Sequence, residues 1–354
     1  MEKKVFIGID FSKLTLDVTF FVGKDIQAKH YKQFSNDKKG CLEIVKWIKK
    51  VNKDCSSWLF CGEFTGIYTM TLVLVLKGLK LDLWLENPMQ IKLSNGLSRD
   101  KNDKVDSFQI SRYAYRFRDR IKLHEHKDSI SIEIRELVRF KDRLTKQKSQ
   151  LFVPAKESKR VLKEFEVTGY IFEQTEKQIK GMNQLIKDVD KRILAIIKAD
   201  TELKNLYDLI TSVVSVGMQT AIYLLLHTSG FTSFEKPRQL ACYCGVAPFS
   251  KRSGTSVRGK SQVSHIANKK LKTLLHMCAL NAIKYDPILK KYYERKVAEG
   301  KHKMSVLNVV RNKLLYFIWA VVKSGNKYDK KYTFDKRQNN ENKIEIPNIN
   351  SKAA

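Results

Sequence analysis

Short apolar runs separated by polar turns dominate the first third of the chain. The runs KVFIGID and LTLDVTFFV flank the turn FSK and are rich in β-branched and aromatic residues, which predicts a β-hairpin, with a third strand near residues 26–33. Helical periodicity over 39–51 precedes the apolar run SWLFCGEF, a helix over 67–78 and a strand at LDLWLEN. Because strands alternate with helices, we expect an α/β layer structure over roughly residues 1–118.

A heptad pattern follows in the middle of the chain. Apolar residues recur every seven positions from Ile130 to Leu151, and spacings of three and four continue through 179–196. Pro154 and Gly169 fall between these two patterns, where a break or kink is expected. The pattern predicts an antiparallel helical hairpin or an intermolecular coiled coil, although plain amphipathic core helices would share the same spacing.

The remainder of the chain has only helical patterns, so we expect an all-α C-terminal domain. Gly217 interrupts two apolar helical stretches in LITSVVSVGMQTAIYLLL, and the end of the chain is polar and low in large apolar residues. We therefore divide the chain into an α/β domain (1–120), a helical coiled-coil or dimerisation region (121–199), a helical domain (200–325) and a flexible tail (326–354).

The charge balance indicates a nucleic-acid partner. The 354 residues include 67 Lys and Arg against 37 Asp and Glu, a net charge of +30, and residues 251–327 hold 18 basic and three acidic side chains. Neutralising phosphates releases counterions, which drives such binding. We find neither a signal peptide nor a run of 18 apolar residues, which argues against a membrane protein. The six scattered cysteines predict reduced thiols in the cytoplasm.

Four acids stand out against this basic background. Asp10 and Glu63 each end a predicted buried strand, while Asp103 and Asp106 open a helix and share one face of it. Each alone could be a turn former, an N-cap or a complement to the helix dipole. Asp100 lies outside the spacing of this pair. Gathered together, the four would need neutralising cations, for which Mg²⁺ with oxygen ligands is suited, and two such ions can clamp the oxygens of phosphoryl transfer.

A basic loop rich in Gly and Ser, APFSKRSGTSVRGK, lies between two helical segments of the second half. Its amides and cations could face a nucleic-acid phosphate, and an ordinary exposed loop would have the same composition. The candidate nucleic-acid contacts are Lys101, Lys104, Arg252, Arg258, Lys260, Lys269, Lys270 and Lys272.

Several motifs, taken in order, resemble the insertion sequence 110 family of DEDD transposases, relatives of the Piv and MooV DNA invertases. The motifs are GIDFSKLTLDV, GEFTGIY, KNDKVDSFQISRYA, SVVSVGMQTAIYLLL and RQLACYCGVAPFSKRSGTSVRGK, and the resemblance spans about residues 4–323. It implies an RNase H-like (RuvC-like) N-terminal domain whose metal ligands are the four acids above. Ser215 and Ala267 stand where the family pattern usually has glycine.

The resemblance also implies a nucleophilic serine beside a glycine in the second half, and Ser253-Gly254 is the matching pair. Ser256 is the main alternative, with Ser250 and Ser261 also nearby. A serine hydroxyl is a weak nucleophile and needs activation, which docking against the acid–metal cluster would supply. Family members use a structured bridge RNA that pairs with donor and target DNA. They are expected to act as homodimers or homotetramers, for which the seam at 179–196 is the candidate contact.

We therefore expect a Mg²⁺-dependent, RNA-guided, site-specific DNA recombinase with a phosphoserine intermediate, with two metal ions per site and Mn²⁺ as a possible substitute. It would reside in the bacterial cytoplasm and associate with the nucleoid when active. Two alternatives stay open at this point. One is a RuvC-like structure-selective endonuclease that uses metal-activated water, and the other is a non-catalytic nucleic-acid-binding protein.

Overall fold

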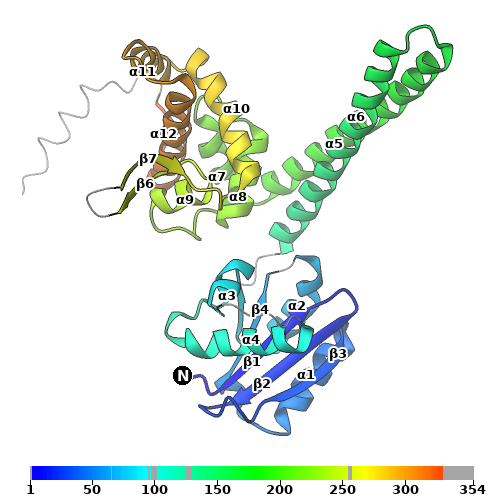
Figure 1. Ribbon diagram of the computed structural model, residues 1–354, viewed down its shortest axis with the longest axis vertical. Helices are drawn as coiled ribbons and strands as arrows, with labels where there is room; N and C mark the ends of the chain where they lie inside the picture. Colours follow the sequence, from blue (N-terminus) through cyan, green and yellow to red (C-terminus); the bar gives the residue numbers. More distant parts are fainter. Residues whose placement is uncertain are drawn as a thin grey trace, which may run out of the picture. The chain divides into compact units, whose positions relative to one another are not determined.

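The chain folds into two units, Met1–His126 and Lys127–Ala354, each of which is described by itself (Figure 1). The computed structural model describes residues 2–64, 66–94, 96, 102–124, 129–253 and 257–329. Lys101, Gly254 and Ser256 lie outside these ranges. For Ser250, Arg252, Ser253, Arg258, Lys260 and Ser261 only the backbone is described.

A five-stranded sheet forms the centre of the first unit, in the order β3-β2-β1-β4-β5. Its strands are β1 (Val5–Phe11), β2 (Thr15–Val22), β3 (His30–Ser35), β4 (Trp58–Glu63) and β5 (Leu83–Glu86). The first three form an antiparallel meander, whereas β4 and β5 run parallel to β1. The predicted hairpin and α/β layer structure are confirmed.

Side-chain alternation gives the sheet two different faces. The face with Ile7 and Ile9 packs on α1 (Lys38–Lys49) and on α2 (Met70–Gly78), which follows a 3₁₀ turn at Ile67–Thr69. The other face, with Phe6 and Cys61, packs on α4 (Asp103–Arg116) and on Ile91 of α3 (Pro88–Ser94). Figure 1 shows α4 lying across this second face. Short 3₁₀ turns at Cys55–Ser57 and Arg118–Arg120 complete the unit.

The approach of α4 to the sheet is very close at Gly8 in the middle of β1. A Cβ at Gly8 would overlap the carbonyl oxygen of Ser107 and the amide nitrogen of Ser111. Both serines are fully buried, and their small side chains let the helix backbone descend onto the strand. Glycine at this position therefore sets the distance between helix and sheet.

The second unit begins with two long antiparallel helices, α5 (Ser129–Val161) and α6 (Glu166–Ala199). The predicted hairpin is confirmed, and its turn falls at 162–165, between Pro154 and Gly169. Both residues lie inside helices, so neither is itself the break. Packing between the helices outweighs the hydrogen bond that the proline loses: Ala155 is buried, and the ring centroids of Phe152 and Phe172 lie 6.0 Å apart.

Part of the 179–196 seam, the candidate dimer contact, packs against another helix of the same chain. Val189 and Ile193 of α6 are buried in the same core cluster as Ile134 and Val138 of α5. These two seam residues are therefore not available to a second copy in this structure.

Helices and one hairpin make up the rest of the second unit. The helices are α7 (Thr201–Ser212), α8 (Met218–Thr228), α9 (Pro237–Tyr243), α10 (Lys269–Tyr285), α11 (Pro287–Ala298) and α12 (Lys303–Ser324). The expectation of an all-α domain is wrong, because β6 (Pro248–Ser253) and β7 (Val257–Val263) pair antiparallel where a loop was expected. β7 begins at Val257 and ends at Val263. The segment is rich in Gly and Ser, which have low strand propensity, so the sequence pattern did not predict a strand here.

The end of the described chain is attached to this unit. The Tyr328 hydroxyl donates to Asp286 Oδ2 at 2.9 Å, and the Tyr328 amide donates to Ser212 Oγ at 2.9 Å. The start of the predicted flexible tail is therefore anchored, and its remainder from residue 330 lies outside the described residues. Within the described ranges, α12 alone is long and apolar enough to span a membrane, and half of that stretch is buried in the core.

The close approach at Gly8 predicts a sharp difference between two glycine substitutions. Gly8→Ala should lower the free energy of unfolding by about 1–3 kcal/mol, because the new methyl group must push α4 off the sheet. Gly181→Ala, in α6 with open space around it, should raise stability by about 0.5–1 kcal/mol. Urea unfolding of both variants checks this. Equal stability of Gly8→Ala and wild type would contradict the packing described.

Candidate active site

Two of the predicted acids end neighbouring parallel strands. Asp10 is the penultimate residue of β1, and Glu63 is the last residue of β4. The register pairs Ile9 with Gly62, so Asp10 and Glu63 follow at the next position of their strands. Asp10 lies two residues beyond Gly8 and hence on the α4 face of the sheet. Both carboxylates are half-buried.

The other two acids occupy the first turn of α4. Asn102 caps this helix, and its side chain accepts a hydrogen bond of 2.8 Å from the amide of Val105. The hydroxyls of Ser107 and Thr19 lie 2.7 Å apart in a buried hydrogen bond that ties the first turns of the helix to β2. Asp103 is exposed and Asp106 half-buried. The N-terminal turn of α4 therefore presents its acids near the ends of β1 and β4.

The four carboxylates lie close enough for their charges to affect one another. The pKa of Asp10 is raised from 3.8 to about 6, first by burial and then by the charges of Asp103, Asp106, Glu63 and Asp17. The pKa of Glu63 is also raised, by burial and by Asp106. Like charges disfavour further ionisation at short range. The structure thus brings together all four acids singled out in the sequence.

The chemistry of this cluster suits a hard divalent cation. Its side chains offer only carboxylate oxygens, the donors that Mg²⁺ prefers. Among the described residues, no lysine or arginine forms an ion pair with Asp10, Glu63 or Asp103. Within the same ranges, no three His, Cys, Asp or Glu side chains already stand close enough to hold a metal ion. The ligands would therefore have to converge on the ion against their mutual repulsion.

Sequence reasoning missed two further acids on the same face. Asp17 of β2 lies directly across from Asp10, and Glu86 of β5 lies directly across from Glu63. Each accepts a tyrosine hydroxyl, Asp17 from Tyr31 at 2.6 Å and Glu86 from Tyr113 at 3.1 Å. The signals available in the sequence were one acid within the apolar run LTLDVTFFV and one at the end of the predicted strand LDLWLEN.

The predicted serine lies in the other unit, at the end of β6. Its backbone pairs with Val257, and the neighbouring Arg252 pairs with Arg258. The hairpin thus brings Ser253 and these two arginines into adjacent backbone positions.

The lysines predicted to contact nucleic acid differ in their surroundings. Lys269 and Lys104 are exposed, and Lys104 Nζ lies 5.0 Å from the centre of the Tyr31 ring. Lys270 Nζ already pairs with Asp142 Oδ1 at 2.9 Å, whereas Lys272 is half-buried beside Gly245. The charge of Lys270 is therefore partly engaged within the chain.

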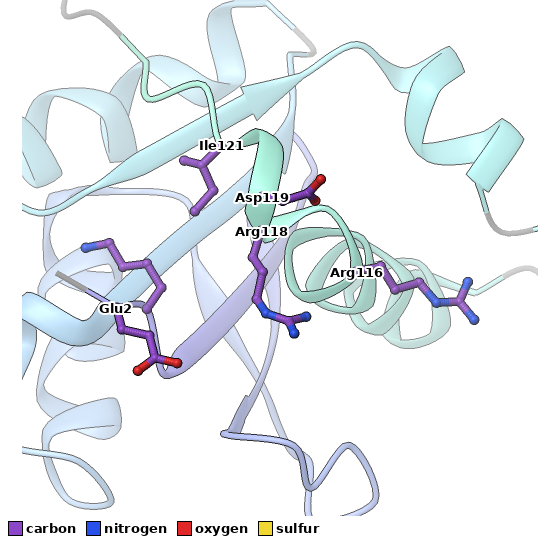
Figure 2. Close-up of a pocket in the computed structure, with 6 residues that line it drawn as sticks. Glu2, Arg116, Arg118, Asp119 and Ile121 are labelled. Atoms are coloured by element: carbon purple, nitrogen blue, oxygen red, sulfur yellow. The ribbon is translucent and has the colours of Figure 1, made fainter.

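An open pocket of the first unit lies away from the acids. Its lining comprises Glu2, Lys3, Arg116, Arg118, Asp119 and Ile121. Figure 2 shows these side chains near the C-terminal end of α4. Lys3 precedes β1 whereas Asp10 lies near its end, so the pocket and the acids occupy opposite ends of that strand. Arg118 is already held against Tyr115, 4.4 Å from its ring centre. None of the predicted site residues lines this pocket.

The raised pKa of Asp10 predicts a stability change with a defined sign. Because Asp10 binds its proton more tightly in the folded state, ionisation weakens the fold as the pH rises from about 4 to about 6. Asp10→Asn should therefore melt at a higher temperature than wild type at pH 7 in EDTA, and the difference should shrink as the pH falls toward 4. Thermal melts at both pH values measure this, with Asp25→Asn in an exposed loop as the control. A lower melting temperature for Asp10→Asn at pH 7 would refute the repulsion.

Comparisons with known proteins found two family models that match this chain. A model of DEDD transposases of the IS110 type, described as "Transposase", matches residues 7–157, and a second, described as "Transposase IS116/IS110/IS902 family", matches residues 207–294. Between them they contain the four acids and Ser253.

Curated relatives extend the likeness over nearly the whole chain. The pilin gene-inverting protein of Moraxella bovis is 26% identical over 332 residues, which cover 93% of this chain and 98% of the relative. The protein of the same name from Moraxella lacunata gives the same values. The insertion element IS110 uncharacterized 43.6 kDa protein of Streptomyces coelicolor is 34% identical over 136 residues, 38% of this chain and 33% of the relative.

Proposed function

The chain belongs to the IS110 family of transposases and is a DNA recombinase, and we propose that it performs RNA-guided, site-specific recombination through a phosphoserine intermediate. The observation that supports this most strongly is that Asp10, Glu63, Asp103 and Asp106, from three separate elements, lie close enough for their charges to affect one another. Such a cluster has no evident role in stability, because its members repel one another.

Asp10, Glu63, Asp103 and Asp106 would hold the divalent ions, two Mg²⁺ per site with Mn²⁺ as a substitute. When bound, these ions supply Lewis-acid polarisation of the scissile phosphate and neutralise its charge. The carboxylates themselves would bind the ions. Because Asp10 and Glu63 are half-buried, fewer water molecules compete with them for the ions. Asn102 supports this role because its cap fixes the helix turn from which Asp103 and Asp106 project.

Ser253 is the proposed nucleophile. Its hydroxyl oxygen would bond to the phosphorus of one DNA strand, and the bond to a deoxyribose oxygen would break. The strand-end hydroxyl thus released can later attack the phosphoserine of another strand and restore the serine. Arg252 and Arg258, adjacent to Ser253 in the hairpin, would contact the DNA backbone. The alternative nucleophile Ser256 lies outside the described residues.

The guide and the assembly are further parts of the proposal. A structured bridge RNA encoded by the element would pair with donor and target DNA, and the net charge of +30 is compatible with holding both nucleic acids. We propose a homodimer or homotetramer in the bacterial cytoplasm that joins the nucleoid when active. Exposed apolar side chains near the turn of the α5–α6 hairpin support an intermolecular contact: Val161, Phe165, Val167 and Tyr170.

Covalent trapping tests the proposal. Purified protein, the candidate guide RNA, Mg²⁺ and donor plus target DNA are mixed and then separated under denaturing conditions. Wild type and Ser256→Ala should form a protein–DNA adduct that depends on the RNA, while Ser253→Ala and Asp10→Ala should form at least 100-fold less, as expected on loss of a nucleophile or a metal ligand (on the order of 10²-fold or more).

The alternatives predict different patterns in the same assay. Cleavage without an adduct, and unchanged in Ser253→Ala, would indicate an endonuclease that uses water. An adduct lost in Ser256→Ala and kept in Ser253→Ala would move the nucleophile to Ser256. Neither adduct nor cleavage in this assay, with DNA binding on a native gel that Asp10→Ala leaves unchanged, would indicate a non-catalytic binding protein.

A further inference from the structure

We propose that Asp17 is a positioning residue of the metal site, whose fixed negative charge behind Asp10 strengthens the binding of a divalent cation. The inference rests on the proposed metal-binding role of Asp10. It concerns a residue that touches neither the DNA nor the ion, and that acts through its neighbour.

Its place in the sheet sets Asp17 directly beside Asp10. The antiparallel register of β1 and β2 pairs these two residues, so their side chains project from the same face of the sheet. Thr19, two residues further along β2, holds Ser107 of α4 on this face. Asp17 is 1% exposed, whereas Asp10 is half-buried. Because β1 lies between β2 and β4, Asp10 stands between the buried Asp17 and Glu63.

The hydrogen bonds of Asp17 hold it in place and occupy both of its oxygens. The Tyr31 hydroxyl donates to Oδ1 at 2.6 Å, and Gln33 Nε2 lies 3.2 Å from Oδ1 and 3.2 Å from Oδ2. Both donors come from β3, the strand on the far side of β2 from β1. These hydrogen bonds hold the Asp17 carboxylate on the β3 side, away from Asp10 and its proposed cation. Asp17 therefore has a supporting role, and Asp10 binds the ion.

The charge of Asp17 is costly unless a cation lies nearby. Like charges directly opposite each other on antiparallel strands are destabilising, and a buried carboxylate without a cation adds a desolvation penalty. Its hydrogen-bond donors are neutral, and no described lysine or arginine forms an ion pair with it. An asparagine could accept the tyrosine hydrogen bond without the charge. The buried negative charge is therefore not explained by the hydrogen bonds of Asp17. Attraction to a divalent ion bound at Asp10 would explain it.

Calorimetric titration of the full chain with Mn²⁺, together with metal-free thermal melts, tests the inference. Asp17→Asn should weaken Mn²⁺ binding by about 10-fold or more, the range found when partners of metal ligands are removed. Its metal-free melting temperature should equal or exceed that of wild type, because the repulsion with Asp10 is gone. Tyr31→Phe keeps the charge and should keep more of the affinity than Asp17→Asn.

A second buried acid provides the matched control. Asp286 is also 1% exposed and accepts a tyrosine hydroxyl, from Tyr328 at 2.9 Å, but it belongs to the second unit and caps α11. Asp286→Asn should leave the Mn²⁺ affinity unchanged. If Asp17→Asn does not fold, Asp17→Thr replaces it, since threonine suits a strand and its hydroxyl can accept from Tyr31.

The outcomes separate the inference from the function on which it rests. Wild-type Mn²⁺ affinity in a folded Asp17 variant would overturn the inference at any melting temperature, and a lowered melting temperature would then make Asp17 a purely structural residue. Even if the inference about Asp17 fails, the proposed metal site is supported when wild type binds Mn²⁺ saturably and Asp10→Asn does not. No saturable binding by wild type would instead contradict the metal site itself, and the inference with it.

Discussion

The close approach of α4 to β1 at Gly8 determines where the acids of the first unit stand. The helix can bring Asp103 and Asp106 near Asp10 and Glu63 because the strand has no side chain at Gly8 and the helix has small ones, Ser107 and Ser111, facing it. The buried hydrogen bond between Thr19 and Ser107 then fixes the helix over β2. Carboxylates separated by nearly a hundred residues meet because backbone packing, and not attraction between them, holds them together.

Repulsion within the cluster is the consequence of that geometry. The strand ends leave Asp10 and Glu63 half-buried, so neither full solvation nor an ion pair with a described lysine or arginine relieves them. Concentrating like charges in this way trades stability for the capacity to bind a cation, a balance found at many functional sites. Asp17 and Glu86, on the strands β2 and β5, each accept a hydrogen bond from a tyrosine. Asp10 and Glu63, on the strands β1 and β4 between them, are left to bind a cation.

Local patterns in the sequence were enough to find the strands of the first unit, the hairpin of long helices and the four acids. Asp17 and Glu86 were missed because their importance depends on cross-strand register, which period-two alternation alone does not reveal. The helix end between the two long helices could be placed only approximately, near Pro154 and Gly169, because local propensity does not include the packing of α6 against α5 that keeps Pro154 inside α5. The β6–β7 pairing was missed because a Gly- and Ser-rich basic segment has weak strand propensity and gains its order from its partner strand.

Anomalous diffraction from crystals of the full chain grown with Mn²⁺ tests the central claim most directly, because it locates the ion without relying on activity. The account predicts anomalous density bounded by the carboxylates of Asp10, Glu63 and the first turn of α4, and its loss in Asp10→Asn crystals grown in the same way. Density elsewhere, with an ordered and metal-free acid cluster, would contradict the claim that these acids form a divalent metal site.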